Sequence, residues 1–288
     1  MKIALGTVQF GLDYGIANQA GRVTLEEVKK IIDQASLANI DTIDTAIAYG
    51  NSESILGQAN VDNFQIITKL PPIPEDCSNI KKWTEGQITD SLNRLNINNL
   101  QGVLLHQPSQ LISKNGDQLL SALHDLKAKG LTKKIGISIY DPQELDKLEN
   151  LMPVDIVQAP LNILDSRLID SGWLKKLKNQ GTEIHIRSVF LQGLLLMNGN
   201  QRPQKFSQWS EVWQEWSRWL DEIELSPLQA CLGYILNIKD IDKLIVGVDS
   251  ALHLQEILAA AHAKLPNLPH WPYPIDTNLI TPSNWNTL

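Results

Sequence analysis

The sequence predicts one α/β domain in which eight parallel strands close into a (β/α)8, or TIM, barrel. The first observation behind this prediction is size, because 288 residues with 43% hydrophobic and 20% charged side chains can build one large core. The second is that short apolar or β-branched segments alternate with amphipathic ones, and the third is that eight such alternations can be counted. We therefore expect a single domain over residues 1–288, with residues 265–288 as a tail over or around the barrel.

Eight segments are expected to form the strands, since each is short and either apolar or β-branched. They are residues 3–6, 42–44, 65–68, 102–106, 134–138, 155–158, 183–188 and 243–246. Between the first two, Thr24 and Glu27 have the spacing of a capping box, and the apolar residues after them are three and four apart, which predicts a helix. Further helices are expected at residues 88–95, 117–129, 142–148, 174–178, 227–235 and 252–261, the fifth with Ser226 as its cap before Pro227.

An open, doubly wound sheet is the alternative architecture. If it bound a dinucleotide, it would normally carry a GxGxxG turn after its first strand. The sequence contains no such turn, so the closed barrel is favoured.

Composition argues against several classes of partner. The formal net charge is -7 and no run of Lys or Arg forms a basic stripe, so nucleic acid is not expected as a partner. The two cysteines, Cys77 and Cys231, are far apart and predict neither a disulfide framework nor a zinc site, which fits a reducing cytoplasm. Because no apolar run is long enough for a signal peptide or a membrane span, we expect a soluble cytoplasmic protein that is a monomer or a weak homo-oligomer.

Proton-carrying side chains follow three successive predicted strands. Asp44 ends the second strand and Tyr49 lies in the loop after it, Lys69 follows the third strand, and His106 ends the fourth. Because (β/α)8 enzymes place their chemistry at the carboxyl ends of the strands, these four groups are expected to meet on one rim.

The segment IDTAIAYGNSESILG, at residues 43–57, resembles the strand-two signature of the aldo-keto reductase family. Residues 67–69 (ITK) and 104–106 (LLH) resemble that family's lysine and histidine strands, and the similarity covers nearly the whole chain. The resemblance implies NAD(P)H-dependent reduction of an aldehyde or ketone, a sugar-like compound among the candidates, to an alcohol. In this role Tyr49 is the general acid, Lys69 its electrostatic partner, Asp44 the counter-ion of the lysine, and His106 the donor that orients the carbonyl.

The chemistry of these residue types supports the same roles independently. A phenol is a poor acid near pH 7 unless a nearby cation such as Lys69 favours its ionised form, and a buried ammonium needs a carboxylate such as Asp44 to stay charged. Taken singly, each residue also has an ordinary structural explanation: a helix cap, a rim aromatic, a lysine that reaches solvent and a core histidine. The combination at successive strand ends favours catalysis.

Cofactor contacts are implied by the same resemblance. Gly6 and Thr7 correspond to residues beside the nicotinamide, and Ser138 and Gln158, assisted by Asn162, to those that hold its carboxamide. The loop with Ser188, Phe190, Gln192 and Gly193, and the turn with Gly247, Asp249 and Ser250, correspond to segments beside the phosphates, although both could be plain polar loops. No metal is implied.

Three departures from the family pattern bear on the cofactor. Ile139 stands where many members have Asn, and Arg187 stands where a Tyr often stacks on the nicotinamide, so its guanidinium would stack instead. His253 stands where the family usually has the Arg that grips a 2'-phosphate, and Ile257 stands where it usually has the terminal Asn of that helix. Asp249 lies nearby and would repel such a phosphate. The resemblance favours NADP(H) slightly, and the departures leave NAD(H) open.

Two aromatic regions and two other functions remain open. Trp209, Trp213, Trp216 and Trp219 form either an aromatic wall for a ligand or, as their spacing favours, the buried stripe of a helix. The tail from His270, Trp271, Pro272 and Tyr273 to Trp285 is either a lid or a belt around the barrel.

Lys69 could instead be the Schiff-base nucleophile of a lyase or aldolase, and a nicotinamide-binding regulatory protein with little turnover is a third class.

Overall fold

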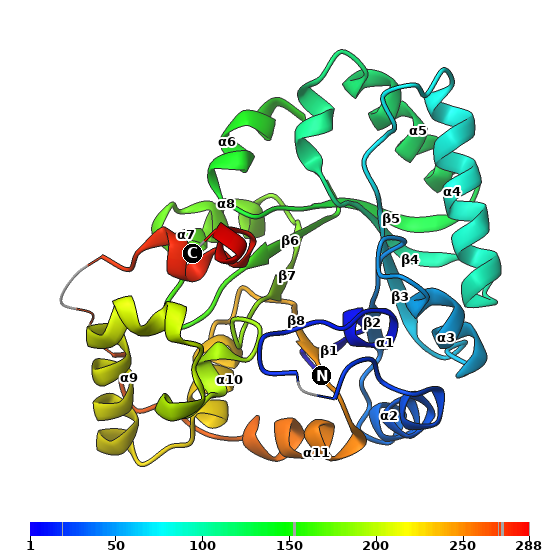
Figure 1. The fold of residues 1–288 in the computed structure, drawn as a ribbon. Helices are drawn as coiled ribbons and strands as arrows, with labels where there is room; N and C mark the ends of the chain where they lie inside the picture. Colours follow the sequence, from blue (N-terminus) through cyan, green and yellow to red (C-terminus); the bar gives the residue numbers. More distant parts are fainter. Residues whose placement is uncertain (19, 152–153, 270, 272–273, 288) are drawn as a thin grey trace.

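The computed structural model describes residues 1–18, 20–151, 154–269, 271 and 274–287, and its eight parallel strands close into a barrel (Figure 1). The strands are β1 (Ile3–Gly6), β2 (Thr42–Asp44), β3 (Gln65–Leu70), β4 (Leu100–Leu105), β5 (Thr132–Ser138), β6 (Ile156–Pro160), β7 (Glu183–Arg187) and β8 (Lys243–Gly247). Each strand pairs in parallel with the next, and β1 pairs with β8 from Ile3↔Leu244 to Gly6↔Gly247, which closes the ring. The predicted fold class is confirmed.

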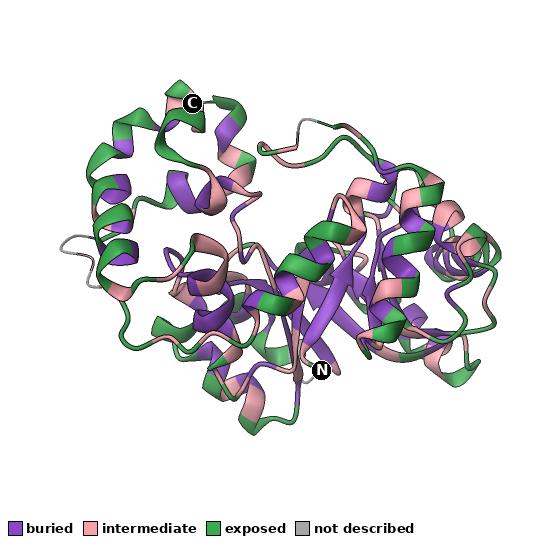
Figure 2. Cartoon of the chain, turned by 90° about the horizontal axis from the view of Figure 1, so that it is seen from below, coloured by how far each residue is buried: buried purple, intermediate pink, exposed green. Residues whose placement is uncertain are grey.

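The helices lie outside the barrel. They are α1 (Val8–Gly11), α2 (Leu25–Leu37), α3 (Ser52–Gln58), α4 (Ile80–Leu95), α5 (Gly116–Ala128), α6 (Gln143–Leu148), α7 (Arg167–Asp170), α8 (Trp173–Asn179), α9 (Ser210–Ile223), α10 (Pro227–Leu236), α11 (Ala251–Ala260) and α12 (Thr277–Ile280). Short 3-10 helices are η1 (Pro108–Ile112), η2 (Glu149–Leu151), η3 (Leu194–Leu196), η4 (Gly199–Gln201), η5 (Gln204–Trp209) and η6 (Pro282–Thr287). Figure 2 shows buried strands inside and helices whose outer faces are exposed.

All eight predicted strands and the predicted helices are present, with shifted ends. Helix α4 begins at Ile80, eight residues before its predicted start, because the side chain of Asn79 accepts the N–H of Lys82 and caps a polar first turn. Strand β7 ends one residue early, since Ser188 adopts a left-handed conformation with φ of 62°.

The predicted capping box of α2 is formed on one side. The Thr24 hydroxyl accepts the N–H of Glu27 at 3.3 Å. The Glu27 carboxylate does not return to the cap; it accepts the N–H of Ala251 at 2.9 Å instead, at the start of α11. Glu27 therefore joins two helices that are adjacent only because the barrel is closed.

The barrel interior holds an apolar cluster of Ile67, Leu104 and Ile156. Two inward-facing glycines make room for it: a Cβ on Gly102 would lie 2.9 Å from Cδ1 of Ile156, and one on Gly136 would lie 2.7 Å from Cδ2 of Leu104. The apolar residues of the strands that face outward, such as Ile184 and Ile186 of β7, pack in the main core between barrel and helices. Residues 183, 185 and 187 of β7 therefore face the interior.

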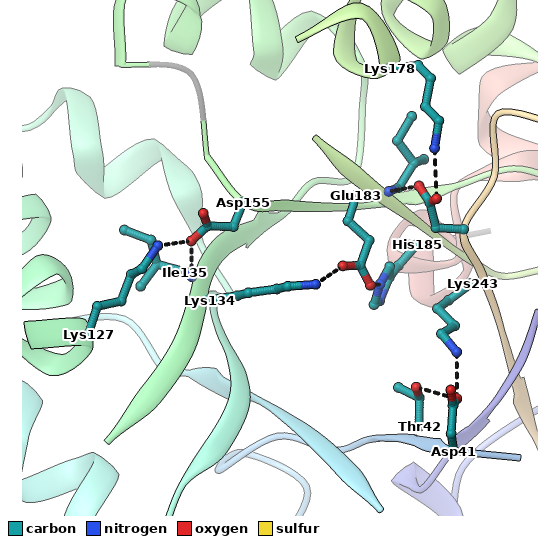
Figure 3. Close-up of polar contacts among 12 residues, drawn as sticks. Asp41, Thr42, Lys127, Lys134, Ile135, Asp155, Lys178, Glu183, His185 and Lys243 are labelled. Carbon is teal, nitrogen blue, oxygen red and sulfur yellow. Dashed lines mark hydrogen bonds and ion pairs between the residues drawn. The ribbon is translucent and has the colours of Figure 1, made fainter. Parts of the chain in front are cut away.

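Ion pairs surround the amino-terminal end of the barrel (Figure 3). Inside the barrel, Lys134 of β5 and His185 of β7 both contact the carboxylate of Glu183. The Glu183–His185 distance is 2.7 Å, and contact with the imidazole together with Lys134 outweighs burial, so that the pKa of Glu183 falls to about 2. A second pair, Lys243–Asp41, links β8 to the residue before β2 at 2.5 Å.

The tryptophan stripe packs as α9 and its preceding turn, as its spacing predicts. Trp209, Trp213, Trp216 and Trp219 are all buried. The indole N–H of Trp213 donates to the backbone of Phe206, and Trp209 donates to Asp276 of the tail.

The C-terminal segment after residue 274 packs on this same aromatic region. Trp285 is buried and meets the ring of Phe206 edge-on at 4.9 Å, and Lys205 donates to its backbone oxygen at 2.6 Å. These contacts attach residues 274–287 to the segment before α9. The predicted tail residues His270, Pro272 and Tyr273 lie outside the described residues, so the choice between lid and belt stays a prediction.

No helix in the described ranges is long and apolar enough to cross a membrane. Within those same ranges, His, Cys, Asp and Glu do not gather in groups of three or more that could hold a metal ion.

Candidate active site at the barrel mouth

The four predicted catalytic residues meet at the carboxyl end of the barrel. Asp44 is the last residue of β2, and the backbone of Tyr49 is held in the following turn by an N–H bond to Ala46. Lys69 is the fifth residue of β3, and His106 directly follows β4, with its N–H bonded to the carbonyl of Leu70. Closure of the barrel therefore places groups from three successive strands on one rim, as predicted.

Lys69 and Asp44 form a buried ion pair. Lys69 is 1% exposed and Asp44 is 3% exposed. The ammonium donates to both carboxylate oxygens and, at 3.1 Å, to the backbone carbonyl of Thr45. Burial opposes the charge of Lys69, but the Asp44 carboxylate outweighs it, so the pKa of Lys69 lies above its ordinary value. Lys69 is thus a permanently charged group at neutral pH.

Tyr49 lies between this ammonium and His106. The Lys69 nitrogen is 5.1 Å from the centroid of the Tyr49 ring, and the rings of Tyr49 and His106 meet edge-on at 5.9 Å. Burial lowers the pKa of His106 to about 4, and the positive charge of Lys69 contributes to the same shift. The imidazole is therefore neutral at pH 7, with one N–H available as a donor.

Ser138 and Gln158 join this cluster from β5 and β6. The Ser138 hydroxyl donates to the amide oxygen of Gln158 at 3.1 Å, and the Gln158 amide nitrogen donates to Asp44 at 2.9 Å. Both side chains are buried, and the network runs continuously from Ser138 to Lys69. Asn162, the predicted helper, donates to the backbone of Ser188 at 3.1 Å and so supports the loop after β7.

The loop after β7 has an unusual backbone. Ser188, Leu191 and Gln192 have positive φ angles of 62°, 49° and 55°, and Gly193 has 89°. A Cβ on Gly193 would lie 2.5 Å from that of Ala17, so glycine is required for this loop to meet the loop after α1. Phe190, in the middle of the loop, packs against the main core.

Gly6, Thr7 and Gly247 lie at the ends of β1 and β8, where the predicted cofactor contacts place them. Each also has a packing role, because a Cβ on Gly6 would lie 2.9 Å from Cγ2 of Ile245 and one on Gly247 would lie 2.4 Å from Nε2 of Gln9. The Thr7 hydroxyl donates to the Asp44 carbonyl at 3.1 Å and accepts from Ser52 at 3.0 Å. Thr7 is fully buried, so this side chain is held within the fold.

The start of α11 is surrounded by acceptors. Ser250 caps the helix by accepting the N–H of His253 at 3.1 Å, and Glu27 accepts the N–H of Ala251. Asp249 is partly buried, and one of its oxygens has no hydrogen-bond partner among the described residues. Burial raises the pKa of Asp249, and His253 is 3.9 Å away.

Arg187 ends β7 with its side chain on the inward-facing side of the strand. Its guanidinium donates to the backbone carbonyl of Ile139 at 2.9 Å and to the Ser188 hydroxyl at 3.2 Å. The guanidinium carbon lies 4.6 Å from the centroid of the Tyr140 ring. The predicted contact with a nicotinamide ring stays a prediction.

Three side chains at this face were not predicted from the sequence. Tyr14 has its phenol oxygen 3.2 Å from the Gln192 amide, and burial, together with the nearby Tyr49, raises its pKa. Tyr140 lies under Arg187, and Glu27 reaches α11. Tyr140 lies two residues after β5, which was an available signal. Tyr14 follows α1, and the reach of Glu27 depends on how α2 and α11 pack, so neither had a comparable signal in the sequence.

The mouth of this closed parallel barrel holds a buried lysine–carboxylate pair, a phenol and a neutral imidazole. This arrangement is that of a (β/α)8 enzyme equipped for proton transfer. The Aldo/keto reductase family matches residues 2–268 of the chain, and the chain belongs to this family of oxidoreductases.

Relatives agree with this assignment, and solved structures share the fold. The oxidoreductase sirO of Leptosphaeria maculans is 26% identical over 67% of this chain and 61% of its own length. The NADH-specific methylglyoxal reductase of Escherichia coli is 24% identical over 81% of this chain and 82% of its own. Among solved structures, the glycerol dehydrogenase AKR11B4 of Gluconobacter oxydans superposes with a TM-score of 0.72 at 20% identity, covering 96% of this chain and 94% of that one. The aldo-keto reductase AKR11C1 of Bacillus halodurans gives 0.71 at 18% identity, covering 97% and 89%.

Proposed function

We propose that the chain reduces an aldehyde or ketone to an alcohol, with Tyr49 as the proton donor and a reduced nicotinamide dinucleotide as the co-substrate. The observation that carries this proposal is the buried Lys69–Asp44 pair beside Tyr49. An ammonium fixed next to a phenol stabilises the negative charge that develops on the phenol oxygen as its proton leaves. Asp44 keeps that ammonium charged.

His106 has the complementary role at the carbonyl oxygen. A neutral imidazole donates a hydrogen bond through one nitrogen and carries no charge that would compete with Lys69. Its pKa of about 4 keeps it in this form across the neutral range. Tyr49 then gives its proton to the oxygen that His106 has oriented.

The residues at the mouth fit a nicotinamide group. Ser138 and Gln158 are adjacent hydroxyl and amide groups, the kind that pairs with a carboxamide, and Gln158 already contacts Asp44 of the catalytic cluster. When bound, the reduced nicotinamide would supply the hydride. The chain's own contribution is to hold the carboxamide through these two side chains and to supply the proton.

For the adenosine end we propose a preference for NAD(H), against the slight lean towards NADP(H) that the resemblance gives. Glu27 and Asp249 bring two carboxylates to the start of α11, and the first N–H of that helix is taken by Glu27. A 2'-phosphate would meet repulsion there, whereas ribose hydroxyls could donate to a carboxylate. The name of the Escherichia coli relative, an NADH-specific enzyme, is in keeping with this preference.

Fluorescence titration with NADH and NADPH tests the preference. We expect NADH to bind more tightly, and a Glu27→Gln, Asp249→Asn double variant to gain affinity for NADPH. Glu222→Gln, an exposed change on α9, is the control for removal of a negative charge. Equal binding of both cofactors by the wild-type protein would contradict the proposal.

The Schiff-base alternative is less well supported. A lysine that attacks a carbonyl must be neutral, but the pKa of Lys69 is raised and its ammonium is engaged with Asp44 and Thr45. Trapping with borohydride distinguishes the two functions, since the reductase proposal predicts no covalent adduct on Lys69. A purely regulatory protein would bind the cofactor without turnover, and the intact cluster of proton-transfer groups favours an enzyme.

The central test is the Tyr49→Phe variant. Loss of the general acid should lower kcat for aldehyde reduction by about 100- to 10,000-fold, while the affinity for NADH stays close to that of the wild-type protein. Stopped-flow turnover and fluorescence titration measure the two quantities separately. If Tyr49→Phe retained full activity, another group would have to be the proton donor and the proposal would fail.

A further inference from the structure

Arg187 is a positively charged side chain at the mouth of the barrel, and it has no acidic partner among the described residues. Lys69 is balanced by Asp44, but in the described part of the chain the polar partners of Arg187 are two uncharged oxygens, those of Ile139 and Ser188. A guanidinium carries five N–H donors, and these bonds use two of them. Arg187 thus retains charge and donors that the fold does not use.

The position of this charge relates it to the reacting groups. Arg187 has the inward orientation of β7, as residues 183 and 185 do, and it stands on the strand opposite β3, which carries Lys69. After burial and the charge of Lys69, the charge of Arg187 also contributes to the low pKa of His106, with only Asp44 acting in the other direction. His106 directly follows β4 and Arg187 is the last residue of β7, so both residues lie at the carboxyl end of the barrel.

The guanidinium is also held in place. Its carbon lies over the ring of Tyr140, and its bond to the Ile139 carbonyl fixes it to the loop after β5. Tyr14 is 39% exposed as a whole residue, and the charge of Arg187 opposes the rise in its pKa that burial causes. Arg187 is itself only partly buried. The cation therefore has a fixed orientation and a partly open side, which suits recognition of an anion.

We infer that Arg187 binds an anionic group, a carboxylate or a phosphate, on the carbonyl substrate. This inference rests on the proposed function, because it assigns the substrate class of the same site. Arg187 is a specificity-determining residue, and it acts on the part of the substrate that does not react. This role of Arg187 differs from the one that the family resemblance implies, which is stacking on the nicotinamide ring. The guanidinium lies over the ring of Tyr140 instead.

The test compares matched carbonyl substrates that differ in charge. 4-Carboxybenzaldehyde is paired with methyl 4-formylbenzoate, and glyceraldehyde 3-phosphate with glyceraldehyde. The wild-type protein should show a higher kcat/KM for the anionic member of at least one pair, and the preferred pair identifies carboxylate or phosphate. In Arg187→Met that preference should fall about 10- to 100-fold, as expected for loss of a hydrogen-bonded charge, whereas Arg187→Lys should retain part of it.

Controls separate this inference from its alternatives. Arg218→Met removes an exposed positive charge on α9 and should leave the preference unchanged. If Arg187→Met weakened NADH binding and lowered kcat/KM equally for both members of each pair, the residue would serve the cofactor and the inference would be overturned. A wild-type protein that prefers the uncharged members would also overturn it.

A binding measurement keeps the inference separate from the proposed function. Calorimetric titration of the protein with saturating NADH by benzoate, and in a second series by inorganic phosphate, needs no turnover. We expect the wild-type protein to bind at least one of these anions and Arg187→Met to bind neither. Should no carbonyl compound be reduced while this difference is still observed, the proposed reaction fails but the anion site stands; if neither anion binds to the wild-type protein, the inference fails.

Discussion

His106 is neutral at physiological pH because burial and the nearby Lys69 remove its proton. Its pKa is about 4 in the folded protein and 6.5 as its ordinary value. Between these two values the unfolded chain binds a proton that the folded chain does not, so stability falls as pH falls from 6.5 towards 4. Above pH 6.5 the residue makes no pH-dependent contribution.

The variant His106→Gln should therefore respond less to acid than the wild-type protein. As pH is lowered from 6.5 to 4, its free energy of unfolding should decrease less, since glutamine takes up no proton. Urea unfolding at several pH values measures the difference. The wild-type pH–rate profile should also lack a step from His106 between pH 5 and 8. Parallel stability curves for the two proteins would show that the imidazole is not held neutral by the fold.

The sequence predicts which residues form the site, but it does not predict the contacts between their side chains. Asp44, Tyr49, Lys69 and His106 could be predicted because a parallel barrel brings successive strand ends together, whichever helices surround them. The bond from Gln158 to Asp44 joins residues 114 apart, and it depends on side-chain rotamers inside the barrel. No local pattern in the sequence encodes such a bond.

At the scale of elements, strands β5 and β7 are held together at their amino ends by Lys134, Glu183 and His185 (Figure 3). The pKa of Glu183 is about 2, below its ordinary 4.5, first because of its contact with His185 and further because of Lys134. Its contribution to stability is therefore complete above pH 4.5 and is lost as pH falls from 4.5 to 2.

We predict that Glu183→Gln destabilises the protein at pH 7 by about 1–2 kcal/mol, a value reduced from that of a fully buried pair because the site is partly exposed. The difference from the wild-type protein should shrink as pH approaches 2. Chemical denaturation at pH 7 and pH 3 measures it, and kcat for the preferred aldehyde is expected to stay near the wild-type value. Glu85→Gln, which breaks an exposed pair with Lys129, serves as the control. A difference that is the same at both pH values would contradict the assignment.

Helices could be predicted from the sequence where the residues that determine them are close together in the chain. Ser226 caps α10 through a complete capping box, and Pro227 begins that helix, as the sequence indicates. Helix α3 was not predicted, because its residues are mostly polar and it forms around the buried carboxylate of Glu53, which accepts from Thr68, Ser91 and Arg94. Those three partners come from β3 and α4, so tertiary contacts determine this helix.

For the whole molecule, the attachment of residues 274–287 to the aromatic region before α9 predicts a stabilising role for Trp285. This side chain is 3% exposed and packs on Phe206. Trp285→Ala should lower the free energy of unfolding by about 3–5 kcal/mol, while KM for the carbonyl substrate changes little if the tail is a belt. Thermal unfolding and steady-state kinetics measure the two effects. A large rise in KM with unchanged stability would indicate a lid instead.

The closed ring itself could be predicted, because the count of eight alternations and the length of the chain leave few other arrangements. Contacts that arise from packing between distant segments could not be predicted. The Glu27 carboxylate reaches Ala251, 224 residues away, only because α2 and α11 flank the seam between β1 and β8. A capping box read from the local sequence gives the wrong partner for that carboxylate.

The pairing of β1 with β8 also affects how the chain folds during its synthesis. Until Lys243–Gly247 has left the ribosome, β1 has a neighbour on one side only, and its free backbone edge can pair with a foreign strand. Most of the chain is therefore synthesised before the ring can shut, so newly made copies are open to aggregation for nearly the whole of translation. Chaperone demand should accordingly be highest just before β8 emerges.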